Sequence, residues 1–172
     1  MRRRLFLLGV FLHVAVLIGW AASLEITRGR AATIRLEVVQ RDPRDLLRGD
    51  YVWLSYAVSD IPVSAFASPP DRAGRGDPVY VALAPKEGVW EIAAASLLRE
   101  ALPILPGHRL LVGSVQFQNP RQGVHVLYGI ERYYVPEGKG NPPRGKIEAE
   151  VALTADGRPF LTRLFVDGRP YP

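Results

Sequence analysis

The feature that most constrains this chain is an uncharged run of nineteen mostly apolar residues, LFLLGVFLHVAVLIGWAAS, at positions 5–23. As an α-helix rising 1.5 Å per residue it would be about 28 Å long, close to the ~30 Å hydrocarbon thickness of a bilayer. Arg2, Arg3 and Arg4 precede the run, and such a cluster holds the N-terminus on the cytoplasmic side. The sequence therefore predicts an N-terminal transmembrane helix, a single-pass membrane anchor over residues 1–24, followed by an extracytoplasmic domain over residues 25–172.

A cleaved signal peptide is the alternative interpretation of the same segment. Ala21, Ala22 and Ser23 are small residues of the kind found before a cleavage site, here ahead of Leu24. The apolar run is longer than the roughly 7–15 residues of a signal-peptide core, which favours a retained signal-anchor. Both interpretations place the following domain in the cell envelope, outside the cytoplasmic membrane.

The charge pattern does not indicate a nucleic-acid partner. The formal net charge is +5, but three of the positive charges are the arginines at positions 2–4. Without them the remaining 19 Lys and Arg exceed the 17 Asp and Glu by only two. Acidic and basic residues also alternate along the domain, whereas a nucleic-acid-binding protein gathers basic residues on one face or element.

The residues that usually hold metals or cofactors are scarce. Cysteine is absent, which excludes disulfides, thiolate metal sites and a cysteine nucleophile. The three histidines, His13, His108 and His125, are not at metal-ligand spacing. We therefore expect no metal and no cofactor, and no motif in the chain identifies an enzyme.

Short apolar runs between Gly and Pro turns indicate a β-rich domain. Alternation is clear where Ile34, Leu36 and Val38 are separated by charged residues. The expected strands cover residues 34–39, 51–58, 78–84, 88–96, 109–117, 124–135, 146–154 and 159–166. Residues 96–102 resemble one short helix that Pro103 would end. The prediction is a mostly antiparallel barrel or sandwich of about eight strands.

Turn residues predict two hairpins within this domain. The pair Asp156-Gly157 lies between two expected strands, which is a strong hairpin signal. Residues 85–88, Pro-Lys-Glu-Gly, are expected to form a second turn. Residues 59–77 contain few apolar runs and are expected to form a long loop, the kind of segment that often carries function.

A dense polar corner, DPRDLLRGD at residues 42–50, leads directly into the expected strand at 51–58. Asp and Gly suit turns, and the arginines are close enough in sequence to pair with the aspartates. One interpretation is a self-paired structural corner, and the other is a surface that binds a ligand or partner. In the strand, alternation would put Trp53 on one face and Leu54 and Tyr56 on the other, where a buried tyrosine hydroxyl needs a hydrogen-bond partner.

Gly49-Asp50-Tyr51, followed by Leu54 and Tyr56, reproduces the pattern Gly-Asp-Tyr-x-x-Leu-x-Tyr, and YGIERYYVPEGKG at residues 128–140 forms a second characteristic segment. With these motifs, the chain resembles the bacterial GDYXXLXY protein family along nearly its whole length. The family has no assigned activity. Its members are encoded near, or fused to, multi-pass membrane proteins, so the resemblance implies a multi-pass membrane protein as partner.

The two motifs together supply the candidate site. We expect the loops at 42–50 and 135–140 to meet at one end of the β-domain. The candidate ligand- or partner-binding residues are Asp42, Arg44, Asp45, Arg48, Gly49, Asp50, Tyr51, Tyr56, Glu131, Arg132, Tyr134, Glu137 and Lys139. The leading hypothesis is a binding module for a membrane partner or envelope ligand. The alternative is an envelope hydrolase that uses Asp50, Glu131 and Glu137 for acid–base chemistry.

Overall fold

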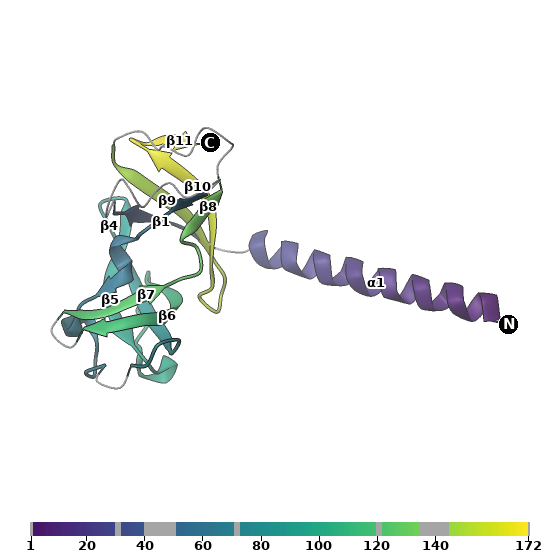
Figure 1. Cartoon of the computed structure of the whole chain (residues 1–172), viewed down its shortest axis with the longest axis horizontal. Helices are drawn as coiled ribbons and strands as arrows, with labels where there is room; N and C mark the ends of the chain where they lie inside the picture. The colour runs from purple at the N-terminus through teal and green to yellow at the C-terminus, as the bar shows by residue number, and fades with distance from the viewer. Residues whose placement is uncertain are drawn as a thin grey trace. The chain divides into compact units, whose positions relative to one another are not determined.

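The computed structural model describes residues 2–29, 32–39, 51–70, 73–119, 122–134 and 145–171. The chain divides into two compact units, Met1–Ala31 and Ala32–Pro172, and each is described by itself. In the described residues the second unit is built from antiparallel β-sheets, while the first is a helix (Figure 1). The predicted mostly β fold class is therefore confirmed.

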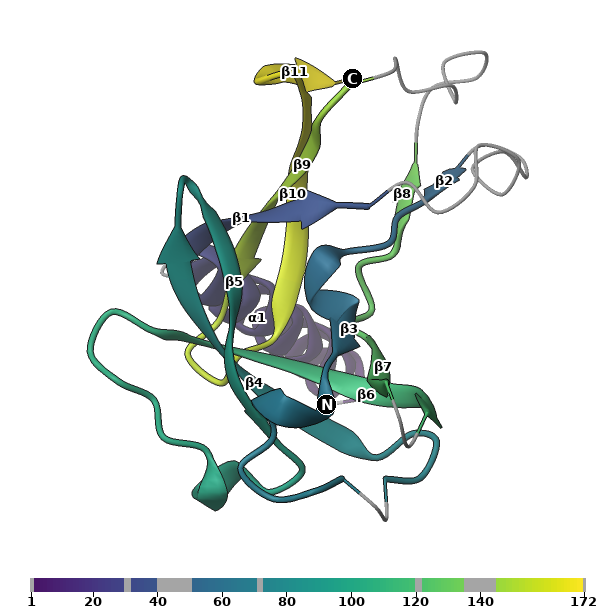
Figure 2. The ribbon, with the colours of Figure 1, turned by 90° about the vertical axis from the view of Figure 1, so that its left-hand side faces the viewer.

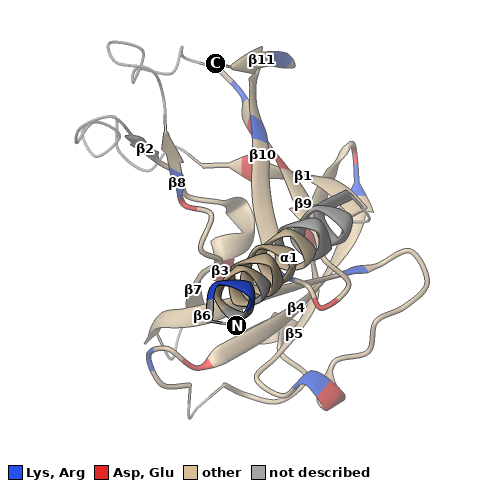
Figure 3. Ribbon diagram, turned by 90° about the vertical axis from the view of Figure 1, so that its right-hand side faces the viewer, with Lys and Arg blue, Asp and Glu red and all other residues tan. Residues whose placement is uncertain are grey.

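Helix α1 (Arg2–Gly29) is a single uninterrupted element. Its sequence contains no proline, and its two interior glycines, Gly9 and Gly19, are tolerated although each weakens a helix. Three of its arginines, at positions 2–4, lie at the N-terminal end (Figure 3), and large apolar side chains such as Phe6 and Phe11 are 69% and 73% exposed. Among the described residues, none of the helices combines the length and hydropathy required to cross a membrane.

The first sheet has the strand order β1-β9-β10-β11. It consists of β1 (Ala32–Val38), β9 (Ile147–Leu153), β10 (Pro159–Val166) and β11 (Arg169–Tyr171). The β9–β10 turn has Gly157 at φ 85°, with the Gly157 amide donating to the Thr154 carbonyl at 2.9 Å. The hairpin predicted at Asp156-Gly157 is therefore confirmed.

The second sheet has the order β3-β7-β6-β4-β5. Its strands are β3 (Asp60–Ile61), β7 (Gly123–Leu127), β6 (Arg109–Asn119), β4 (Pro78–Lys86) and β5 (Val89–Ser96). Glu87 and Gly88 form the β4–β5 turn, both with positive φ. Such a two-residue turn matches the right-handed strand twist, so the expected turn at 85–88 is confirmed but is tighter than the sequence indicated.

A separate ribbon pairs β2 (Tyr51–Trp53) with β8 (Arg132–Tyr134) (Figure 2). One hydrophobic core lies between the sheets and includes residues of both, such as Leu36 and Val151 from the first and Val81 and Leu111 from the second. These side chains are fully buried, as alternation along half-buried strands requires. The architecture is thus two larger sheets on a shared core, with the ribbon beside them.

Two expected strands are shorter than predicted. The strand expected at 51–58 ends at Trp53, and residues 57–59 form the 3₁₀ turn η1 (Ala57–Ser59). The strand expected at 124–135 breaks between β7 and β8. There Gly129 has φ 80°, and the buried carboxylate of Glu131 accepts the Tyr128 amide at 2.6 Å. A side chain that bonds its own backbone competes with the ladder and ends the strand.

The expected helix at 96–102 is a single 3₁₀ turn, η3 (Arg99–Ala101). The Ser96 hydroxyl accepts the Leu98 amide at 3.0 Å, and Leu98 keeps an extended backbone. Pro103 follows too closely for a longer helix. The loop expected at 59–77 instead contains β3 and the 3₁₀ turn η2 (Val63–Ala65), and β11 was also not predicted. The expectation of about eight strands was therefore too low.

Candidate functional site

The β2–β8 ribbon brings the two motif segments together. Tyr51 pairs with Tyr134 and Trp53 pairs with Arg132 in the antiparallel register. One residue further, the Leu54 amide donates to the Glu131 carbonyl at 2.7 Å. Segments about 80 residues apart in sequence therefore pair as neighbouring strands.

The described side chains of this ribbon are aromatic and cationic. Trp53 is 38% exposed and Tyr134 is 70% exposed. The Arg132 guanidinium lies 5.8 Å from the centroid of the Trp53 ring, within cation–π range. Because Trp, Tyr and Arg dominate the energetics of protein interfaces, this face has the composition of a contact surface.

Behind the ribbon, tyrosine hydroxyls and a carboxylate satisfy backbone groups inside the fold. The Tyr56 hydroxyl donates to the Ile130 carbonyl and the Tyr128 hydroxyl to the Val58 carbonyl, both at 2.6 Å. Glu131 is 5% exposed. Burial, and to a smaller extent the nearby Glu131 carboxylate, raises the pKa of both phenols well above the ordinary value. This network fixes the path of the chain between β2 and β8.

Four predicted site residues and the backbone of a fifth can therefore be placed. Arg132 and Tyr134 are exposed on β8, whereas Tyr56 and Glu131 are buried beneath the ribbon. Tyr51 is placed by its backbone pairing alone. The others, Asp42, Arg44, Asp45, Arg48, Gly49, Asp50, Glu137 and Lys139, lie outside the described residues, as does the predicted meeting of their loops.

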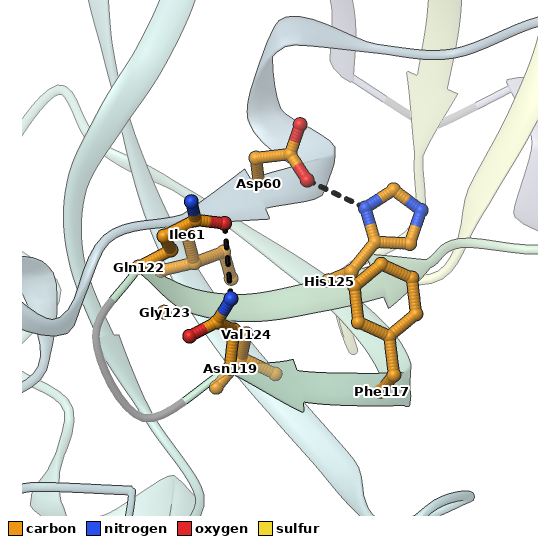
Figure 4. Close-up of a pocket in the computed structure, with 8 residues that line it drawn as sticks. All are labelled: Asp60, Ile61, Phe117, Asn119, Gln122, Gly123, Val124 and His125. Atoms are coloured by element: carbon orange, nitrogen blue, oxygen red, sulfur yellow. Dashed lines mark hydrogen bonds and ion pairs between the residues drawn. The ribbon is translucent and has the colours of Figure 1, made fainter.

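Sequence reasoning missed a second cluster, on the five-stranded sheet. Asp60 on β3 and Phe117 on β6 both lie opposite His125 on β7 in the strand registers. The His125 Nδ1 lies 2.6 Å from Asp60 Oδ1, and the rings of Phe117 and His125 stack with centroids 4.8 Å apart (Figure 4). These residues border a pocket of about 330 Å³. No local motif marks the cluster, because its members come from three strands.

A second pocket of about 260 Å³ is lined by Glu37, Ala57, Val58, Pro62, Val89, Trp90, Glu91 and Ile92. Neither of these two pockets includes Glu131, the one motif carboxylate that can be placed. Among the described residues, no group of three or more metal-ligating side chains converges. In the part of the chain that the structure describes, the arrangement therefore offers an exposed aromatic and cationic face, two pockets and hydrogen-bonding groups.

The fold and the paired motifs define a small antiparallel β-domain organised around a buried Tyr–Glu network. Residues 13–164 match the family described as GDYXXLXY protein, and the chain belongs to that family. The match includes both motif segments. Comparison with curated proteins and with solved structures found no match.

Proposed function

We propose that the protein is a membrane-anchored binding module whose extracytoplasmic β-domain contacts a membrane-protein partner through the β2–β8 ribbon. The observation that carries this proposal is the exposed aromatic and cationic face of Trp53, Arg132 and Tyr134. The antiparallel pairing of β2 with β8 places these three side chains on one face of the ribbon, where a partner could contact them together.

The anchor is supported by the sequence of α1. Its uncharged run at 5–23 follows three arginines, and it includes side chains such as Phe11 and Trp20 that are 73% and 63% exposed. In water a continuous apolar surface of this kind is unfavourable, whereas lipid accommodates it. An anchor would hold the β-domain at the membrane surface, where a multi-pass membrane protein could be contacted.

The alternative of an envelope hydrolase is weaker because of Glu131. A general acid or base must reach its substrate within hydrogen-bonding distance. The Glu131 carboxylate is buried and holds the Tyr128 amide. Its position suits the turn between β7 and β8 rather than proton transfer to a bound substrate.

The test is affinity purification of the full chain from membranes after crosslinking, followed by mass spectrometry. Wild type is compared with a Trp53→Ala/Tyr134→Ala double variant and with Phe160→Ala as control. Phe160 is a matched control because it is 38% exposed, as Trp53 is, but lies on β10. We expect one multi-pass membrane protein with wild type and control, depleted at least about tenfold with the double variant.

Thermal melting of each variant accompanies the purification. If the double variant melts like wild type and still retrieves the same protein, the ribbon is not the contact surface. If wild type enriches no membrane protein over an unrelated anchored domain, the binding function itself is wrong.

A further inference from the structure

The pocket at Asp60, His125 and Phe117 has a geometry that the proposed partner surface does not use. In β6 the register with β7 passes from Val115 opposite Val126 to Phe117 opposite His125, so Gln116 is an extra residue. Without this bulge, alternation would put Phe117 on the same face as the buried Val115. The bulge instead turns the ring outward, where it is 54% exposed beside His125. Bulges commonly re-aim side chains next to functional sites.

A glycine lets β3 approach β7 closely at the edge of the hollow beside this aromatic pair. Gly123 lies opposite Asn119, with φ 130°, and a Cβ atom there would collide with the carbonyl of Ile61. On the far side of the hollow, Asn119 Nδ2 donates to Gln122 Oε1 at 3.1 Å. Figure 4 shows the carboxamide pair and the aromatic pair facing the same space, with Asp60 above. The pocket therefore has an apolar wall and a polar wall.

The lining selects a chemical class of ligand. Among the described residues, the lining contains no Lys or Arg and includes the carboxylate of Asp60, which disfavours phosphate or another anion. A wholly apolar ligand would offer no hydrogen bonds to the carboxamides of Asn119 and Gln122, which line the pocket and bond each other. Carboxamides both donate and accept hydrogen bonds, as hydroxyl groups do, and an aromatic ring covers an apolar C–H face. These requirements are met together by a sugar ring.

We propose that this pocket binds a neutral sugar residue, with its apolar face on Phe117 and its hydroxyls on the carboxamides and Asp60. Its volume of about 330 Å³ is at the lower end of ligand pockets, which suits one residue of a glycan rather than a large ligand. The site is independent of the β2–β8 ribbon, because it uses other strands and other side chains.

The experiment titrates the full chain with N,N′,N″-triacetylchitotriose and with maltotriose, using isothermal calorimetry in a detergent that carries no sugar headgroup. We expect saturable binding of at least one trisaccharide. Phe117→Ala should weaken that binding by about tenfold or more, while Phe117→Trp should retain it, since it keeps an aromatic face. Asn119→Ala should also weaken binding because it removes hydrogen-bonding groups.

Tyr134→Ala is the matched control, since it removes an exposed aromatic side chain from the ribbon. It should leave sugar binding unchanged, and Phe117→Ala should leave retrieval of the membrane partner unchanged. This pair separates failure of the sugar site from failure of the proposed function. The absence of saturable binding to both trisaccharides, or binding unaffected by Phe117→Ala, overturns the proposal. Tighter binding of spermidine or inorganic phosphate at the same residues overturns the assigned ligand class.

Discussion

At the scale of single residues, Leu54 shows how the GDYXXLXY motif serves the core. Leu54 is 1% exposed, and its amide donates to the carbonyl of Glu131. Leu54→Ala should lower the free energy of unfolding by about 2–5 kcal/mol, because it removes buried methyl groups and leaves a cavity. Urea denaturation measures this change. Trp53→Ala is the neighbouring control, and an equal loss in both variants would contradict the assigned burial.

Tyr56 and Tyr128 make stability depend on alkaline pH. Burial raises the pKa of both phenols above their ordinary value of 10.0, so the folded state keeps protons that the unfolded state loses. Their contribution is complete below about pH 10 and is lost as pH rises further, by up to about 1.4 kcal/mol per pH unit for each tyrosine.

Urea denaturation between pH 8 and 11 tests this dependence. The exposed Lys86 and Lys146 also have raised pKa values, so their stabilising contribution is likewise lost as pH rises. The slope of each variant must therefore be compared with that of wild type. Tyr56→Phe and Tyr128→Phe should each reduce the slope above pH 10. If the slope is the same in both variants as in wild type, the two phenols are not held protonated by the fold.

At the scale of elements, local patterns predicted the regular strands well. Ile34, Leu36 and Val38 alternate with polar residues because one face of β1 meets the core, and all three are buried. The Asp156-Gly157 turn was recognised because few other residues suit its backbone. The pair Asp167-Gly168 carries the same signal before β11, with both residues at positive φ, and could have been recognised in the same way.

These local patterns could not predict contacts between segments that are distant in sequence. The segment 128–134, YGIERYY, has aromatic and β-branched residues on both sides of its charged pair, so it resembled the continuation of the strand before it. Its break depends on Glu131 folding back onto the Tyr128 amide. The bulge at Gln116 and the resulting row from Asp60 to Phe117 likewise depend on the registers of three strands. For the described part of the candidate site, alternation predicted the buried Tyr56 with its bonded hydroxyl, but the motifs did not show that Glu131 is buried.

Gly113 on β6 tests how closely β6 and β7 pack. A Cβ atom at this position would collide with a side-chain methyl of Val126 and lie 2.7 Å from the ring of Tyr128. Gly113→Ala should therefore lower the free energy of unfolding by about 1–3 kcal/mol, since a packed site has no room for another methyl group. Chemical denaturation measures the loss, and Ser114→Ala on the next residue is the control. A Gly113→Ala variant as stable as wild type would mean that the strands can separate without cost.

At the scale of the whole molecule, the two proposed contact sites use different parts of the β-domain. The motif ribbon is held by the Tyr56, Tyr128 and Glu131 network, while the proposed sugar pocket depends on β3, β7 and β6. The chain between them is short, because Tyr56 and Asp60 are separated by the turn η1. Substitutions in the buried network should therefore disturb both sites, whereas substitutions at Trp53 or Phe117 should each affect one.

The topology of the whole chain gives the last prediction. A reporter that is active only outside the cytoplasm, fused after Pro172, should be active if the arginines at positions 2–4 hold the N-terminus inside, as we propose. Mass spectrometry of the purified wild-type chain should give the full-length mass. An Ala21→Leu/Ala22→Leu variant, which lacks the small residues of a cleavage site, should differ in mass only by its substituted side chains. Replacing all three arginines with alanine should reduce reporter activity, since the orientation signal is weakened. A wild-type product that begins near Leu24, with the variant remaining full length, would mean that residues 5–23 are a cleaved signal and that the β-domain is released.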